Sequence, residues 1–153
     1  MNAALWEDIS VRPMRTADID AVMAVERDVY PFPWTAGNFR DSIRAGYSCW
    51  VCEIGVCLIG YGVMMVGAGE AHLLNLSVSR AWQGKGVGRR LLLHFMNVAR
   101  EGGAAVMLLE VRPSNTAARR LYLRSGFREI GVRKNYYPAE KGREDALVME
   151  RAL

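Results

Sequence analysis

Hydrophobic residues recur along the chain with two different periods, and each period predicts one type of element. Alternation at every second residue, or a short apolar run, is typical of strands, whereas recurrence every three or four residues is typical of helices. The pattern predicts strands over residues 9–14, 48–54, 58–66, 71–78, 106–111, 127–134 and 146–153. It predicts helices from the cap residue Thr16 to just before Pro31, from Thr35 to Arg44, from Val87 to just before Gly102, and from Thr116 to Arg124.

Polar residues and glycines at the predicted boundaries support these helices. Thr16, Thr35 and Asn115 are expected N-caps, because their side-chain oxygens can accept the free N–H groups of a first helical turn. Gly126 suits the position that follows a helix. A polar loop with two adjacent tyrosines is expected over residues 135–143, between the last two strands.

The order of these elements predicts a mixed α/β fold in a single domain, residues 1–153. Three or four successive antiparallel strands come first, and the strand at 71–78 then leads through a helix to the strand at 106–111. Such a crossover places the two strands parallel and near each other, with their carboxyl ends together. We expect a mostly antiparallel sheet with one parallel pair, flanked by about four helices.

A glycine-rich segment, residues 83–88, separates the 71–78 strand from the helix that follows. Glycines at a helix start leave backbone N–H groups uncovered, and the helix dipole adds positive potential at the same point. Arg80, Lys85, Arg89 and Arg90 add positive charge. The segment predicts a phosphate-binding loop, with a glycine-rich turn and a solvated basic rim as the alternative.

The spacing of the glycines distinguishes among known phosphate-binding loops. A P-loop needs a hydroxyl residue after its lysine, but Gly86 follows Lys85. A dinucleotide-binding loop needs a third glycine where Arg89 stands. Glu110 lies near the place of a ribose-binding acid, so the dinucleotide alternative stays open.

The segment resembles the pyrophosphate-binding loop of the GNAT acetyltransferases, Gln/Arg-x-x-Gly-x-Gly/Ala, through Gln83, Gly86 and Gly88. Further segments, YPFPWTAGNF, LEVRPSNTAARRLYLRSGF and RKNYYPAEKGREDALVM, resemble the RimI type of ribosomal-protein alanine N-acetyltransferases. The resemblance implies the GNAT acyl-CoA N-acyltransferase fold, in which the parallel strands splay apart in a V. It also implies acetyl-CoA as cosubstrate and no metal. The residues that it implies for binding acetyl-CoA are Leu76, Ser77, Val78, Gln83, Gly84, Lys85, Gly86, Val87, Gly88, Arg89 and Asn115.

Glu110 stands at the end of the apolar 106–111 run, where a carboxylate is costly to bury without a partner or a purpose. Burial is expected to raise its pKa toward the range of a general base, and an ion pair with Arg112 or Arg119 is the alternative. Tyr122, from its pattern alone, is a core tyrosine. The resemblance implies instead that Glu110 is the base, acting through a water, and that Tyr122 is the acid that protonates the CoA sulfur.

An α-amine is a plausible acceptor, because it titrates near pH ~8 and a lysine near ~10.4, so it loses its proton more readily. The resemblance implies the N-terminal alanine of small-subunit ribosomal protein eighteen, contacted by Trp34, Tyr136 and Tyr137. Lysine side chains, polyamines and small metabolites are alternative acceptors. A non-catalytic module that binds CoA or nucleic acid is an alternative of another class.

Composition and charge narrow the remaining possibilities. The net charge of +4 suits an anionic cofactor, and because Lys and Arg form no long run we expect no stable nucleic-acid binding. No basic targeting segment or long apolar run is visible, so we expect a soluble, cytoplasmic monomer that does not bind membranes. Cys49, Cys52 and Cys57 are expected to be buried free thiols.

Overall fold

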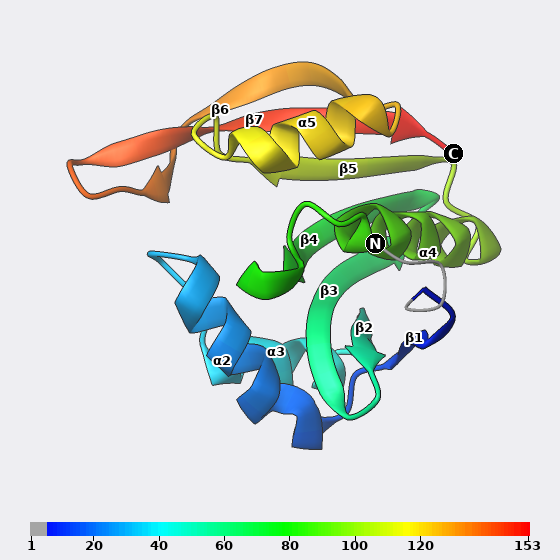
Figure 1. Ribbon diagram of the computed structural model, residues 1–153. Coiled ribbons are helices and arrows are strands. Elements are labelled where there is room, and N and C mark those ends of the chain that lie inside the picture. The colour runs from blue at the N-terminus through cyan, green and yellow to red at the C-terminus, as the bar shows by residue number, and fades with distance from the viewer. Residues whose placement is uncertain (1–5) are drawn as a thin grey trace.

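The computed structural model describes residues 6–153, which form a seven-stranded mixed sheet in the order β1-β2-β3-β4-β5-β7-β6 (Figure 1). The strands are β1 (Ile9–Pro13), β2 (Ser48–Ile54), β3 (Cys57–Gly67), β4 (Glu70–Val78), β5 (Val106–Val111), β6 (Arg128–Pro138) and β7 (Arg143–Ala152). The α-helices are α2 (Ile19–Val29), α3 (Ala36–Arg44), α4 (Val87–Glu101) and α5 (Thr116–Arg124), and short 3-10 turns lie at η1 (Thr16–Asp18) and η2 (Arg80–Trp82).

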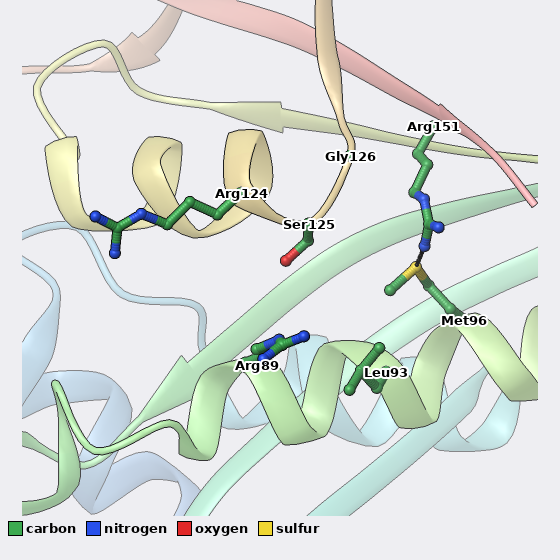
Figure 2. Close-up of a pocket in the computed structure, with 7 residues that line it drawn as sticks. All are labelled: Arg89, Leu93, Met96, Arg124, Ser125, Gly126 and Arg151. Carbon is green, nitrogen blue, oxygen red and sulfur yellow. Dashed lines mark hydrogen bonds between the residues drawn. The ribbon is translucent and has the colours of Figure 1, made fainter.

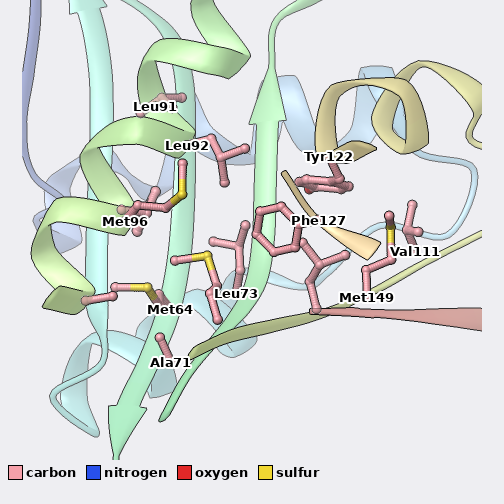
Figure 3. Close-up of a cluster of buried hydrophobic side chains, with 14 of the residues drawn as sticks. Met64, Ala71, Leu73, Leu91, Leu92, Met96, Val111, Tyr122, Phe127 and Met149 are labelled. Atoms are coloured by element: carbon pink, nitrogen blue, oxygen red, sulfur yellow. The ribbon is translucent and has the colours of Figure 1, made fainter. Parts of the chain in front are cut away.

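The helices cover the two faces of the sheet in pairs. On one face, α4 and α5 bury Leu91, Leu92 and Tyr122 in the larger of two hydrophobic clusters (Figure 3). On the other face, α2 and α3 bury Val22 and Phe39 in the second cluster. Each helix presents one apolar stripe to the sheet, as the three- and four-residue spacing predicts.

Two glycines of β3 allow α4 to lie unusually close to the sheet. A Cβ atom at Gly62 would lie 2.5 Å from the Phe95 ring and 2.9 Å from the Asn75 carbonyl oxygen. A Cβ atom at Gly60 would lie 2.9 Å from a methyl carbon of Leu91. Side chains at these positions would push the helix away and move its first turn, which borders the phosphate-binding loop.

The parallel strands β4 and β5 pair over only four residues each. Their register runs from Glu70 opposite Val106 to Leu73 opposite Leu109, although β4 continues to Val78. The β3–β4 register shifts at the same point, because Val63 pairs with Asn75 and Met64 with Leu73, which leaves Leu74 unpaired. A bulge bends its strand, so β4 turns away from β5 here. The expected parallel pair and its splay are thus confirmed.

Three of the sequence expectations are wrong in detail. Thr16 does not cap α2, because a 3-10 turn precedes the helix and the Asp18 carboxylate accepts the backbone N–H of Arg15 at 2.7 Å. Residues 135–138 belong to β6, so the loop before β7 is shorter than predicted. Cys49 and Cys52 are buried, but Cys57 is exposed at the start of β3.

Gly62→Ala should lower the free energy of unfolding by about 1–3 kcal/mol, because the added methyl overlaps the Phe95 ring and a backbone carbonyl. Urea unfolding followed by circular dichroism measures the change. Gly67→Ala is the control, since a Cβ at this other β3 glycine has no neighbour within 4 Å. Equal destabilisation by both substitutions would contradict the close approach of α4.

Candidate active site

The glycine-rich segment forms a tight loop between η2 and α4. Gly84 and Gly86 have φ angles of 73° and 88°, a left-handed conformation that favours glycine. Gly86 is the N-cap of α4 and has no side chain to bond the first-turn N–H groups, so these donors face outward. At Gly88, a Cβ would lie 3.4 Å from Leu121 and 3.7 Å from Val78, which shows how closely α4, α5 and β4 converge. The loop fits a bound pyrophosphate.

Two of the four basic residues near the loop are held by other segments of the chain. Arg90 donates to the backbone carbonyls of Trp6 at 2.8 Å and Ile9 at 3.0 Å, and so fixes the N-terminal segment. Arg80 pairs with Asp28. Lys85 and Arg89 form no ion pair within residues 6–153, and the expected positive charge of all four residues at a bound anion stays a prediction. Gln83 donates from Nε2 to the Val78 carbonyl at 3.0 Å and ties the loop to the end of β4.

The outer part of β4 supplies one wall of a gap between β4 and β5. Beyond Leu73 this strand pairs with β3 alone, so backbone groups of residues 74–78 have no partner on β5. Unpaired groups of this kind can bond an extended chain in the manner of an added strand. The predicted pantetheine contacts at Leu76, Ser77 and Val78 lie on this segment.

Glu110 lies one residue beyond the last β5 residue that pairs with β4, and its side chain is 10% exposed. One carboxylate oxygen lies 2.5 Å from His72 Nε2, and the other lies 3.3 Å from Arg133 Nε. The hydrogen bond with His72 lowers the pKa of Glu110, and this effect outweighs the opposing effect of burial. The expected rise of this pKa is wrong. The alternative, an ion pair with Arg112 or Arg119, is also wrong, because Arg112 pairs with Glu144 and Arg119 with Glu129.

His72 was not anticipated as a site residue from the sequence. It lies on β4 opposite Leu108 of β5, so its side chain reaches the carboxylate two residues further along the neighbouring strand. The available signal was a histidine on β4, the strand expected beside the one that carries Glu110. This signal could not be used from the sequence alone, because the register of β4 against β5 must be known to place His72 beside Glu110.

Tyr122 faces the larger core cluster from α5 and is 7% exposed. Its ring meets Phe127 edge to face, with centroids 5.6 Å apart. Burial raises the pKa of Tyr122, and neighbouring Tyr30 and Tyr137 raise it further. Asn115 accepts the Ala118 N–H at 3.2 Å, so the predicted N-cap is confirmed, while its predicted contact with the cofactor stays a prediction.

The two predicted acceptor-binding segments lie on either side of Arg112. Its guanidinium lies 4.4 Å from the ring centre of Tyr137 and 5.5 Å from that of Phe32. Tyr136, 46% exposed, lies beside Tyr137 with ring centres 4.9 Å apart. A cavity of about 550 Å³ opens here, lined by Pro31, Phe32, Arg112, Ser114, Ala139, Glu140 and Glu144.

Trp34 is not an exposed wall of this cavity. Its ring packs against Phe39 at 5.1 Å in the second core cluster, and its backbone N–H donates to Glu26 at 2.9 Å. Phe32 is the exposed aromatic residue of this segment. Phe32 is therefore the aromatic residue of this segment that lines the cavity, and the predicted acceptor contact of Trp34 stays a prediction.

A buried polar network joins this segment to β4. Glu26, 1% exposed, accepts hydrogen bonds from the Tyr61 hydroxyl at 2.6 Å and the Asn75 amide at 3.2 Å, besides the Trp34 N–H. The Tyr30 hydroxyl lies 2.7 Å from Ser77 Oγ. Three donors compensate the buried carboxylate. The sequence showed Glu26 only as a charged residue on an apolar helix face.

Comparison with known proteins identifies the class of enzyme that this architecture represents. The acetyltransferase (GNAT) family matches residues 19–127. The chain therefore belongs to the GNAT acetyltransferase family, and its cosubstrate is acetyl-CoA. No helix in residues 6–153 has the length and apolar character needed to cross a membrane, and no three His, Cys, Asp or Glu residues of that range are grouped to hold a metal ion.

Within that family, the chain is similar to ribosomal protein bS18-alanine N-acetyltransferase of Escherichia coli K12, with 34% identity over 140 residues, 92% of this chain and 95% of that one. The crystal structure of the ribosomal-protein-S18-alanine N-acetyltransferase from E. coli superposes with a TM-score of 0.87, at 33% identity over 94% and 93% of the two chains. YncA of Salmonella typhimurium, solved with its cofactor acetyl-CoA, shares the fold, with a TM-score of 0.79 and 22% identity over 95% and 94%.

Glu110→Gln should destabilise the fold more at pH 7 than at pH 3. The pKa of Glu110 is lowered in the folded state, so its carboxylate adds stability above the unfolded pKa, and this stability is lost as pH falls through the folded pKa. Urea unfolding of both proteins across this pH range measures the difference.

His72→Gln is the matched variant, because it removes the largest cause of the pKa shift and keeps the carboxylate. In this background the effect of pH on the Glu110→Gln difference should shrink. A difference that stays constant from pH 7 to pH 3 in the wild-type background would contradict the assigned pairing.

Proposed function

We propose that this enzyme transfers the acetyl group of acetyl-CoA to the N-terminal amine of a ribosomal protein that begins with alanine, in the cytoplasm. The observation that carries the acceptor is the 34% identity to a bS18-alanine N-acetyltransferase over nearly the full length of both chains. The geometry supports it with a carboxylate at the open end of the β4–β5 gap and a cavity between two loops beside it.

The donor side of the reaction uses backbone groups. The first-turn N–H groups of α4 hold the pyrophosphate, with Lys85 and Arg89 beside them. Residues 74–78 of β4 bond the pantetheine arm, so that the thioester enters the gap. A backbone N–H near Val78 donates to the carbonyl oxygen as that oxygen gains negative charge.

Glu110 acts as the proton acceptor, through a water. Because its pKa is lowered, the residue is a carboxylate at neutral pH and has no proton of its own to lose. A lowered pKa also makes the carboxylate a weaker base. It can deprotonate an α-amine, with a pKa near ~8, more readily than a lysine, with a pKa near ~10.4. His72 and Arg133 fix the direction of the carboxylate from the two sides.

Tyr122 donates a hydrogen bond from its hydroxyl to the departing sulfur. The raised pKa keeps the phenol protonated at neutral pH, so the hydrogen is always available. A thiol has a pKa near ~8.5, so complete transfer from a phenol above ~10 is uphill. We therefore assign Tyr122 the stabilisation of the thiolate by a hydrogen bond, with the final proton coming from the acetylated amine through solvent.

Tyr122→Phe should lower kcat by about 10²-fold or more, because a positioned hydrogen-bond donor to a developing negative charge contributes on this scale. The affinity for acetyl-CoA should stay nearly unchanged, since the ring and its packing on Phe127 are kept. Steady-state kinetics and calorimetric titration of acetyl-CoA measure the two quantities. Tyr47→Phe, which removes a hydroxyl beside the second core cluster and outside the predicted site, is the control. Equal losses of kcat and acetyl-CoA affinity in Tyr122→Phe would contradict the role.

A mass-spectrometric assay should show acetylation of a peptide with a free N-terminal alanine and none of its α-blocked twin. The blocked twin has no free α-amine to react. A third peptide, with a blocked terminus and a free lysine, should gain little mass, because the pKa of the lysine is higher than that of an α-amine. Mass gain on the lysine peptide alone would overturn the proposed acceptor.

A further inference from the structure

The side chain of Tyr30 reaches the gap between β4 and β5 from the end of α2. Its hydroxyl lies 2.7 Å from Ser77 Oγ and 3.3 Å from the Leu76 carbonyl oxygen. Both partners belong to the part of β4 that has no partner on β5. The proposed roles of Glu110 and Tyr122 leave this hydroxyl unused.

The Leu76 carbonyl faces the gap, and it locates the Tyr30 hydroxyl there. In an antiparallel pair, every second residue bonds the partner strand. Ser79 donates its N–H to the Ile59 carbonyl at 2.9 Å. In the same register Ser77 also bonds β3, and Leu76 points the opposite way, toward the gap. The Tyr30 hydroxyl therefore lies at the open edge of β4.

Tyr122 approaches the same place from the other face of the sheet. Burial raises the pKa of Tyr122, and the proximity of Tyr30 adds to this rise. The helices α2 and α5, which carry these tyrosines at or near their ends, cover opposite faces. The two side chains can come close only through the opening in the sheet.

A chain of hydrogen bonds with a fixed direction ends at Tyr30. The Glu26 carboxylate can only accept, so the amide nitrogen of Asn75 faces it, at 3.2 Å. The amide oxygen of Asn75 accepts the Ser77 hydroxyl at 2.6 Å, and Ser77 has no second hydrogen to donate. The Tyr30 hydroxyl therefore donates to Ser77 Oγ.

The Tyr30 oxygen is left as a hydrogen-bond acceptor at the gap. Burial raises the pKa of Tyr30 to about 12, which keeps its hydrogen in place at neutral pH. The 3.3 Å separation from the Leu76 carbonyl is too long to compete with the bond to Ser77. Within residues 6–153 no other group donates to the Tyr30 oxygen, and a hydroxyl oxygen has two lone pairs.

The acceptor amine is the N–H group best placed to reach this oxygen. Tyr30 directly precedes Pro31 and Phe32, which line the cavity between the two predicted acceptor-binding segments. The acetyl thioester itself has no N–H group, whereas a primary amine has two after it loses its proton. The amide N–H groups of the pantetheine arm are the other donors, and they belong to the cosubstrate.

We propose that the Tyr30 oxygen accepts a hydrogen bond from an N–H of the acceptor amine and so orients this amine toward the thioester. Ser77 is a positioning residue, because it takes the Tyr30 hydrogen and turns the lone pairs to the gap. This inference deepens the proposed function and rests on an amine acceptor, whether that amine is an N-terminus or a lysine.

Tyr30→Phe should lower kcat/KM for a peptide that begins with alanine by about 10-fold, the scale of one hydrogen bond. The Kd of acetyl-CoA should stay within about 2-fold of the wild-type value, because the amine is not part of this ligand. Steady-state kinetics at saturating acetyl-CoA and calorimetric titration of acetyl-CoA measure the two quantities. A loss of acetyl-CoA affinity that accounts for the whole effect would place the pantetheine arm on Tyr30 and overturn the proposal.

Tyr61→Phe is the matched control, because it removes another hydroxyl of the same network, which donates to Glu26 at 2.6 Å inside the core. It should lower the free energy of unfolding in urea and keep kcat/KM for the peptide. An unchanged kcat/KM in Tyr30→Phe, or an equal fall in Tyr61→Phe, would overturn the proposal.

Ser77→Ala tests the positioning role, since it removes the acceptor of the Tyr30 hydrogen and keeps the backbone of β4. It should lower kcat/KM for the peptide in the wild-type background and have little further effect in Tyr30→Phe. Fully additive losses would contradict this role.

The choice of peptide separates this inference from the proposed N-terminal acceptor. If the wild type acetylates only a lysine peptide, the N-terminal acceptor fails, and the fall of kcat/KM in Tyr30→Phe is then expected with the lysine peptide. If the wild type acetylates no amine, the proposed function and the role of Tyr30 are both overturned.

Discussion

Backbone pairing between the parallel strands β4 and β5 ends early, and the candidate active site is built around this opening. Parallel strands ordinarily bond along their shared length, but here the ladder stops at Leu73 and Leu109, beside the bulge at Leu74. The opened strands expose backbone donors and acceptors and place Glu110 at the mouth of the gap. A continuous ladder would satisfy these groups internally and leave no place for a thioester.

Opening a sheet in its middle requires support from both faces, and the two core clusters supply it. On one face, glycines of β3 let α4 pack closely, which fixes the glycine-rich loop at its start. On the other face, Glu26 accepts three hydrogen bonds that join α2, β3, β4 and the segment after α2. Rigid donors on both sides preorganise the site before either substrate binds.

The charged residues have different roles in this structure. Many arginines pair with carboxylates or, like Arg90, donate hydrogen bonds to backbone carbonyls, and these contacts hold segments together. Glu110 is held ionised by His72, which suits an acceptor of protons at neutral pH. Three arginines without an acidic partner in residues 6–153, Arg89, Arg124 and Arg151, line one pocket beside α4 (Figure 2).

Several elements could be predicted from the sequence, because apolar spacing, cap residues and glycines are local patterns. The structure confirms the features that follow from neighbouring residues: the apolar stripe of α4, the caps Thr35 and Asn115, the antiparallel pair of β2 and β3, and the glycine-rich loop. Tertiary structure alone determined four other features. These are the pairing of His72 with Glu110, the lowered pKa of Glu110, the burial of Glu26, and the hydrogen bonds of Arg90 to backbone carbonyls. Each depends on which residues of distant segments come into contact, and strand register and helix packing set those contacts, which no local pattern encodes.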